Sequence, residues 1–191
     1  MSSPAEALQL VLAALDRLEI HYMIGGSVAS SVHGVGRPTM DVDLVVELSE
    51  PRLLDLLEAI RGSFYADAET GLEALRRGRA FNVIHLGSAY KFDIFPLRSG
   101  TYDASAFARR SFRQSRMFGE QPIEFSVASA EDTMLAKLRW YQEGGGHSQR
   151  QLEDVAGILQ VQGGALDWSY LRKWAKELGL EELLARFDPN R

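Results

Sequence analysis

Apolar side chains recur along the N-terminal part of the chain with the period of an α-helix. The first such run follows Ser3-Pro4, a pair typical of a capped helix start with proline at its first position. Its apolar positions are Leu8, Val11, Leu12, Leu15 and Leu18. The same reasoning predicts further helices over 27–33, 51–61, 69–77 and 102–110.

Short runs rich in β-branched and aromatic residues separate these helices and predict strands. The first two cover 21–26 and 41–47. A hairpin is predicted from 81–86 and 89–97 around Gly87-Ser88, and a second one lies within 112–127 around Gly119-Glu120.

After Ser129 the pattern becomes helical throughout. Ser129 with Asp132, and Ser148 with Gln151, have the spacing of capping boxes. The second of these helices carries an apolar stripe, which consists of Leu152, Val155, Ala156 and Leu159. A third helix is expected from about Asp167, and a short charged one ends the chain. We therefore predict an α+β fold: a mixed β-sheet flanked by helices over 1–128, then a small helical region over 129–191.

Composition narrows the function classes. The chain contains no cysteine, so disulfides and thiolate metal sites are excluded. A net charge of −5 argues against a general nucleic-acid coat. The N-terminal residues lack the pattern of a signal peptide, and no apolar run reaches the roughly 20 residues that span a bilayer. We expect a cytoplasmic protein without a membrane partner.

Two aspartates in the strand 41–47 need an explanation, because Asp has poor strand propensity and neighbouring like charges repel. Asp41 and Asp43 point to the same face of the strand, about 6.5 to 7 Å apart. Paired carboxylates are oxygen ligands for hard divalent cations such as Mg²⁺, which would cancel the repulsion. Asp93, between Phe92 and Ile94 in a later strand, is the candidate third carboxylate.

The segment Gly25-Gly26-Ser27 lies where a predicted strand ends and a helix begins. Backbone amides at a helix start favour anions, and glycine permits close approach. The segment is therefore a candidate phosphate-binding turn.

Together these motifs resemble the nucleotidyltransferase superfamily of the DNA polymerase β type. The pattern runs from GGS at 25–27 through Gly36-Arg37-Pro38-Thr39 to Asp41-Val42-Asp43-Leu44, with Asp93 downstream. Within the superfamily it is similar to AbiEii-like bacterial enzymes. Lys137, with Arg150 and Asp154, resembles their downstream K…R…D pattern.

The resemblance implies transfer of an NMP from an NTP such as ATP to an acceptor hydroxyl, with release of pyrophosphate. Asp41, Asp43 and Asp93 would be catalytic and would bind two Mg²⁺ ions, with Mn²⁺ as an alternative. Gly25, Gly26, Ser27, Arg37 and Lys137 would bind the nucleotide.

Several of these residues have structural alternatives. Arg37 could contact substrate or pair with Asp41 or Asp43. Lys137 could bind phosphate or be a solvated residue beside an apolar helix stripe. For Asp154 we expect an intrahelical ion pair with Arg150, four residues earlier.

The acceptor is open. An RNA or tRNA end is favoured, as for AbiEii-like toxins of toxin–antitoxin systems, because arginines surround Phe112. These are Arg109, Arg110, Arg113 and Arg116, with Arg76, Arg77 and Arg79 elsewhere. An ordinary solvated junction between a helix and a strand accounts for these arginines slightly better. The alternatives are nucleotidylation of a small molecule or a partner protein, or a non-catalytic nucleotide-binding, antitoxin-like module. A cognate partner protein is a further candidate partner.

Overall fold

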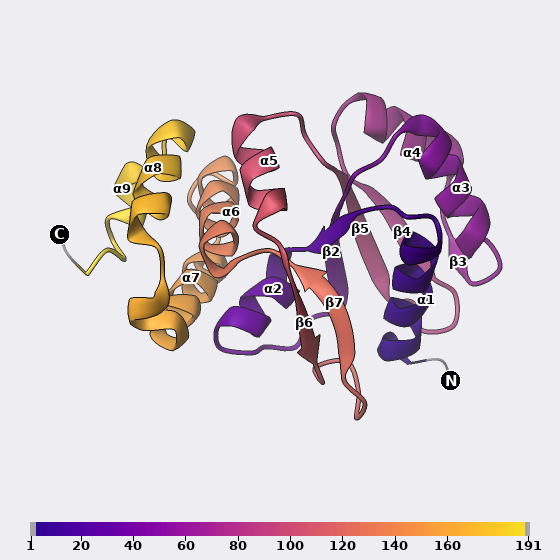
Figure 1. Cartoon of the computed structure of the whole chain (residues 1–191), viewed down its shortest axis with the longest axis horizontal. Helices are drawn as coiled ribbons and strands as arrows, with labels where there is room; N and C mark the ends of the chain where they lie inside the picture. The colour runs from indigo at the N-terminus through magenta and orange to yellow at the C-terminus, as the bar shows by residue number, and fades with distance from the viewer. Residues whose placement is uncertain (1–2, 190–191) are drawn as a thin grey trace. The chain divides into compact units, whose positions relative to one another are not determined.

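The computed structural model describes residues 3–189 and divides them between two compact units (Figure 1). Of the described residues, the sheet unit comprises 3–24 and 39–127, and the helical unit comprises 25–38 and 128–189. The segment 25–38 is thus grouped with the C-terminal helices, although it follows the first strand directly. None of the helices in 3–189 combines the length and apolar character needed to cross a membrane.

A seven-stranded mixed sheet forms the centre of the sheet unit, in the order β3-β4-β5-β2-β1-β7-β6. The pairs β2–β5 and β1–β7 are parallel, and the other neighbouring pairs are antiparallel. The strands are β1 Tyr22–Ile24, β2 Asp41–Val46, β3 Phe64–Tyr65, β4 Phe81–His85, β5 Lys91–Pro96, β6 Ser111–Ser115 and β7 Ile123–Val127. The predicted mixed sheet and both hairpins are confirmed. The two-residue strand β3 was not predicted, because so short a segment carries no periodicity.

Helices cover one face of this sheet. α3 (Glu50–Ile60) packs between α1 (Pro4–Arg17) and α4 (Ala68–Arg76), while α1 contacts β7 and α4 contacts β4. Gly71 of α4 lies against Leu53 of α3 and Phe81 of β4. The side chains of β2 and β5 that share this face, such as Leu44 and Ile94, are buried because the helices exclude water from it. The helix α5 (Thr101–Ala108) connects β5 to β6.

The helical unit packs α2 (Gly26–His33) against α6 (Ala130–Glu143) and α7 (Gln149–Gln162). Gly34, directly after α2, permits a close approach to α7, because a Cβ there would lie 2.7 Å from the backbone nitrogen of Ile158. A 3₁₀ helix (Gly163–Ala165), α8 (Trp168–Leu178) and α9 (Glu181–Leu184) complete the unit.

The predicted cap of α6 is confirmed, whereas two predictions for α7 are corrected. Ser129 caps α6, and its hydroxyl oxygen accepts from the Asp132 N–H at 3.1 Å. Ser148 precedes α7, but its side chain makes no capping bond; its carbonyl accepts from the Gln151 N–H instead. The predicted α7 stripe is also displaced, since the helix buries two adjacent faces, one against α6 and one against α2. Its buried residues are Asp154, Val155, Gly157 and Ile158.

Candidate active site

Three aspartates lie on two adjacent strands, on the sheet face opposite α1, α3 and α4. In the parallel register of β2 and β5, Asp43 is directly opposite Asp93, and Asp41 is opposite Lys91. Side chains along both strands alternate between buried and half-buried, and all three aspartates belong to the half-buried set. The structure therefore brings together Asp41, Asp43 and Asp93, which we call the acid row.

Lys91 brings a positive charge to this face. Its Nζ lies 2.9 Å from a carboxylate oxygen of Asp93, two residues along the same strand. Asp93 raises the pKa of Lys91 most, through this hydrogen bond and its charge, and the charges of Asp41 and Asp43 add to the effect. The ammonium group thus compensates the repulsion that the acid row would otherwise suffer.

Polar side chains also hold the carboxylates in place. Asn82, opposite Asp93 on β4, donates its side-chain N–H to the Asp93 carboxylate. The hydroxyl group of Thr39 donates to the Asp41 carboxylate at 2.8 Å. The hydroxyl group of Tyr90 in turn donates to the Thr39 carbonyl oxygen at 3.2 Å. Burial, followed by the charge of Asp41, raises the pKa of Tyr90 to about 12, so this donor keeps its proton.

The donor set of the acid row suits a hard divalent cation by its chemistry, since it offers carboxylate oxygens from two strands. The carboxylates of the row, however, already have partners within the protein. Across residues 3–189, no group of three or more His, Cys, Asp or Glu side chains is placed so that it could hold a metal ion. Lys91 forms an ion pair with Asp93, to which Asn82 also donates a hydrogen bond, and Thr39 donates a hydrogen bond to Asp41.

The candidate phosphate-binding turn lies in the helical unit. Gly25 precedes α2 as its N-cap and offers no side-chain cap to the first amides of the helix. Gly26 has φ +56°, a left-handed conformation that favours glycine. Ser27 is buried in the first turn of α2.

Arg37, Asp154 and Lys137 form a buried ion triad within the helical unit. Arg37 donates to both carboxylate oxygens of Asp154, through Nε at 3.0 Å and one terminal nitrogen at 3.2 Å. Nζ of Lys137 lies 2.7 Å from the same carboxylate, and both of these side chains are about 5% exposed (6% for Lys137 and 5% for Asp154). Burial raises the pKa of Asp154, but the hydrogen bonds and charges of Arg37 and Lys137 outweigh it and hold that pKa below its ordinary value.

Two structural predictions, for Asp154 and for Lys137, are therefore wrong. Asp154 does not belong to an exposed helix face paired with Arg150, because α2 and the segment after it cover that face. Lys137 is not a solvated flank residue, because it is buried against Asp154. For Arg37 the structure shows a partner that the sequence analysis did not consider, Asp154. The nucleotide-binding roles of Arg37 and Lys137 stay predictions.

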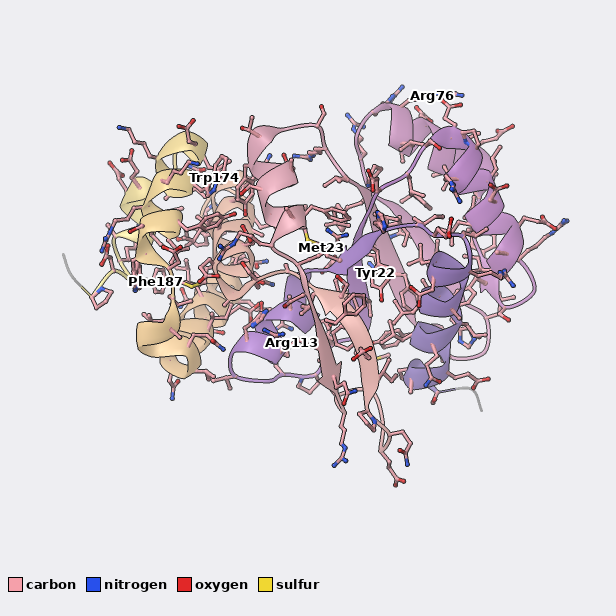
Figure 2. The ribbon with its side chains drawn as sticks, viewed as in Figure 1. Tyr22, Met23, Arg76, Arg113, Trp174 and Phe187 are labelled. Atoms are coloured by element: carbon pink, nitrogen blue, oxygen red, sulfur yellow. The ribbon has the colours of Figure 1, made fainter. Side chains whose placement is uncertain are left out.

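The arginines around Phe112 have different surroundings. Arg110 lies over the Phe107 ring at 4.1 Å and donates to the Phe107 carbonyl oxygen, so it is part of the packing of α5. Arg113 and Arg116 are exposed at the β6–β7 hairpin, where Phe112 is 64% exposed (Figure 2 marks Arg113). Arg76 and Arg77 pair with Glu50 and Glu73 respectively.

Sequence analysis missed Lys91, Asn82 and Thr39 as parts of the site. Lys91 could have been found, because a residue two positions before Asp93 in a strand shares its face. Thr39 has the same relation to Asp41, in a segment whose threonine was noted without a role. Asn82 could not have been found without the β4–β5 register.

Comparison with family models finds no match to the sequence, and comparison with curated proteins finds no significant match. Solved structures do match. An antigenic nucleotidyltransferase-like protein from Paracoccidioides brasiliensis is 18% identical, with a TM-score of 0.54 over 93% of this chain and 92% of that one. The antibiotic-resistance factor ANT(2″)-Ia is 16% identical, with a TM-score of 0.56 over 95% and 96%. The structure of ANT(2″)-Ia in complex with adenylyl-2″-tobramycin is 17% identical, with a TM-score of 0.55 over 90% of this chain and 95% of that one. The chain therefore has the fold of nucleotidyltransferases.

Proposed function

We propose that this protein is a nucleotidyltransferase, which moves an NMP from an NTP to an acceptor hydroxyl. The observation that carries the proposal is the acid row: Asp43 directly opposite Asp93, with Asp41 one step along the same face. Lys91 sets one positive charge against three half-buried carboxylates, so the row keeps a net negative charge that suits a divalent cation. The fold shared with nucleotidyltransferases over nine-tenths of both chains supports the same reaction.

In this proposal Asp41, Asp43 and Asp93 would hold Mg²⁺, as two ions, or Mn²⁺ in its place. Bound there, the ions would neutralise the triphosphate and stabilise an in-line displacement. The acceptor oxygen forms a bond to the α-phosphorus while the bond from that phosphorus to the bridging oxygen breaks, and pyrophosphate leaves. The Asp93 carboxylate takes the proton of the acceptor hydroxyl. Thr39 and Asn82 orient the carboxylates of Asp41 and Asp93.

The proposed phosphate-binding residues belong to the helical unit. Gly25, Gly26 and Ser27 present backbone amides at the start of α2, where an anion is favoured. The buried ion triad combines two cations, Arg37 and Lys137, with one carboxylate. Its net positive charge supports the proposed role of these two side chains in binding phosphate.

We infer a small hydroxylated molecule as the leading acceptor class. The solved structure of ANT(2″)-Ia with adenylyl-2″-tobramycin is a protein of matching length and fold with a nucleotidylated small molecule. RNA is the second candidate, because exposed Phe112, Arg113 and Arg116 at the β6–β7 hairpin suit a single strand. A toxin role, a cognate partner protein and a protein acceptor stay predictions.

Calorimetry with each of the four NTPs, with and without Mg²⁺, tests the proposed reaction. Wild type should bind at least one NTP in a Mg²⁺-dependent manner, and Asp41→Asn/Asp43→Asn should lose that dependence. Failure of wild type to bind any NTP with Mg²⁺ would refute the proposal and favour a non-catalytic module. Transfer of label from the preferred NTP to aminoglycoside-like molecules and to total tRNA then compares the acceptors.

Salt separates the two acceptor classes. An RNA acceptor should bind less tightly as salt rises, whereas an uncharged small molecule should be nearly indifferent. For charged, aminoglycoside-like acceptors the arginine variants make the distinction. Arg113→Ala/Arg116→Ala should reduce labelling of RNA and leave labelling of a small molecule unchanged. Arg61→Ala, which removes another exposed arginine, is the matched control.

A further inference from the structure

We propose that Lys91 is a positioning residue: its ammonium group is the resident counter-ion of the acid row, and a divalent cation must displace it from Asp93. This inference rests on the proposed function, because it assigns the order in which two cations use the same three carboxylates. It goes beyond that function because it gives a role to a side chain that is neither an acid of the row nor a part of the phosphate-binding turn.

The position of Lys91 in the sheet is the first support. In the register of β2 and β5 it lies opposite Asp41, and on its own strand it precedes Asp93 by two residues. All three aspartates therefore surround it on one face, and its Nζ contacts Asp93 at 2.9 Å. On the other side it pairs with Ile84 of β4, which offers no competing charge.

The state of Asp93 is the second support. This carboxylate is 15% exposed and is held by Lys91 and Asn82, so its oxygens are committed to two donors. Within 3–189, no three acids are grouped so that they could hold a metal ion as they stand. The donor chemistry fits a hard cation, but Lys91 already supplies the positive charge that such a cation would bring.

Competition between Lys91 and a divalent cation for the Asp93 carboxylate follows from their charges alone. Lys91 and a divalent cation cannot both sit against Asp93 without repelling each other. A unit charge about 6 Å from a divalent cation repels it enough to lower affinity about tenfold, even in a water-like dielectric. The Lys91 side chain is 41% exposed, so it can move toward solvent when a cation arrives.

Binding of Mn²⁺ to the full chain without nucleotide tests this proposal, by electron paramagnetic resonance of free Mn²⁺ at fixed pH and low salt. Lys91→Met should bind Mn²⁺ about tenfold more tightly than wild type. Lys91→Arg keeps the charge and should stay within about twofold of wild type. Lys176→Met removes an exposed lysine of α8 and controls for the change in net charge. Equal affinity of Lys91→Met and wild type would overturn the proposal.

Thermal unfolding gives a second readout that does not depend on activity. Without metal, Lys91→Met should unfold at a lower temperature than wild type, because the acid row loses its counter-ion. Mn²⁺ should raise the midpoint of Lys91→Met more than that of wild type. An equal shift in both proteins would contradict the proposal.

The two proposals fail in different ways. If wild type and Asp41→Asn/Asp43→Asn bind Mn²⁺ equally, the acid row is not a metal site and the proposed function fails with it. If wild type binds through the acid row but Lys91→Met shows no gain, only the role of Lys91 is refuted.

Discussion

Removal of the Asp154 carboxylate should destabilise the helical unit severely, because it leaves a buried lysine without its anion. Asp154 holds Lys137 at 2.7 Å and Arg37 through two hydrogen bonds. Arg37 is 29% exposed and can be hydrated, whereas Lys137 is 6% exposed. The cost of Asp154→Ala therefore falls mainly on Lys137.

The magnitude can be bounded from the lysine. A buried charge that loses its partner keeps the full cost of its removal from water. Breaking a buried ion pair by removing one partner costs about 3 to 5 kcal/mol in other proteins. We expect Asp154→Ala to lose about 3 to 4 kcal/mol of unfolding free energy. That is a large share of the roughly 5 to 15 kcal/mol of a whole domain.

Tryptophan fluorescence during urea unfolding is the assay, because Trp140, Trp168 and Trp174 all belong to the helical unit. The matched control is Glu153→Ala, which removes an exposed carboxylate one position earlier in α7 and should cost less than about 0.5 kcal/mol. The double variant Asp154→Ala/Lys137→Met removes both buried charges and should recover about 2 kcal/mol relative to Asp154→Ala.

The pH dependence gives an independent check on the same reasoning. The triad lowers the pKa of Asp154, so its stabilisation is complete above the ordinary aspartate pKa of about 3.9 and is lost as pH falls through the lower folded value. The gap between wild type and Asp154→Ala should narrow over that acidic range. A cost of Asp154→Ala equal to that of Glu153→Ala, or a double variant without recovery, would refute the triad as a buried structural unit.

Three further predictions concern the phosphate-binding turn, the contact of α2 with α7, and the surroundings of the acid row. Gly26→Ala should destabilise the helical unit by about 1 to 2 kcal/mol in the same urea assay, because φ is +56° there. Gly25→Ala has open space around its Cβ, so it should leave stability nearly unchanged while weakening NTP binding. Equal stability costs of the two variants would contradict this. Gly34→Ala should cost about 1 to 3 kcal/mol because its Cβ meets the Ile158 backbone, whereas Gly36→Ala, which meets nothing within 4 Å, should cost little. Absorbance titration at alkaline pH should show Tyr90 ionising near 12, so its contribution to stability is complete below about pH 10 and lost as pH rises through 12; loss of a normal tyrosine signal near pH 10 in Tyr90→Phe would contradict the assignment.

The sequence predicted local structure well where it depends on neighbouring residues. The Ser3 and Ser129 caps, the turn at Gly87-Ser88 and the alternation in 41–46 each rest on contacts within a few residues. The pairing of acids on one face followed from strand geometry alone. The triad could not be predicted in this way, because Arg37 and Asp154 are 117 positions apart in the sequence. An arginine four positions before an aspartate suggested a local ion pair, and only the packing of α2 on α7 shows that this face is buried.

The acid row shows how a sheet can carry charges that its propensities disfavour. Aligning Asp43 with Asp93 would be unfavourable on a bare sheet, since like charges directly opposite repel. Lys91 removes part of that cost from within the same strand, while Asn82 and Thr39 fix the carboxylates. Under the proposed function, a site preorganised in this way would be stable before any cation arrives, and the counter-ion that stabilises it would weaken the binding of a metal. Affinity for the metal would then be set by the difference between two cations at the same carboxylate, so a single lysine would tune it without any change in the ligands.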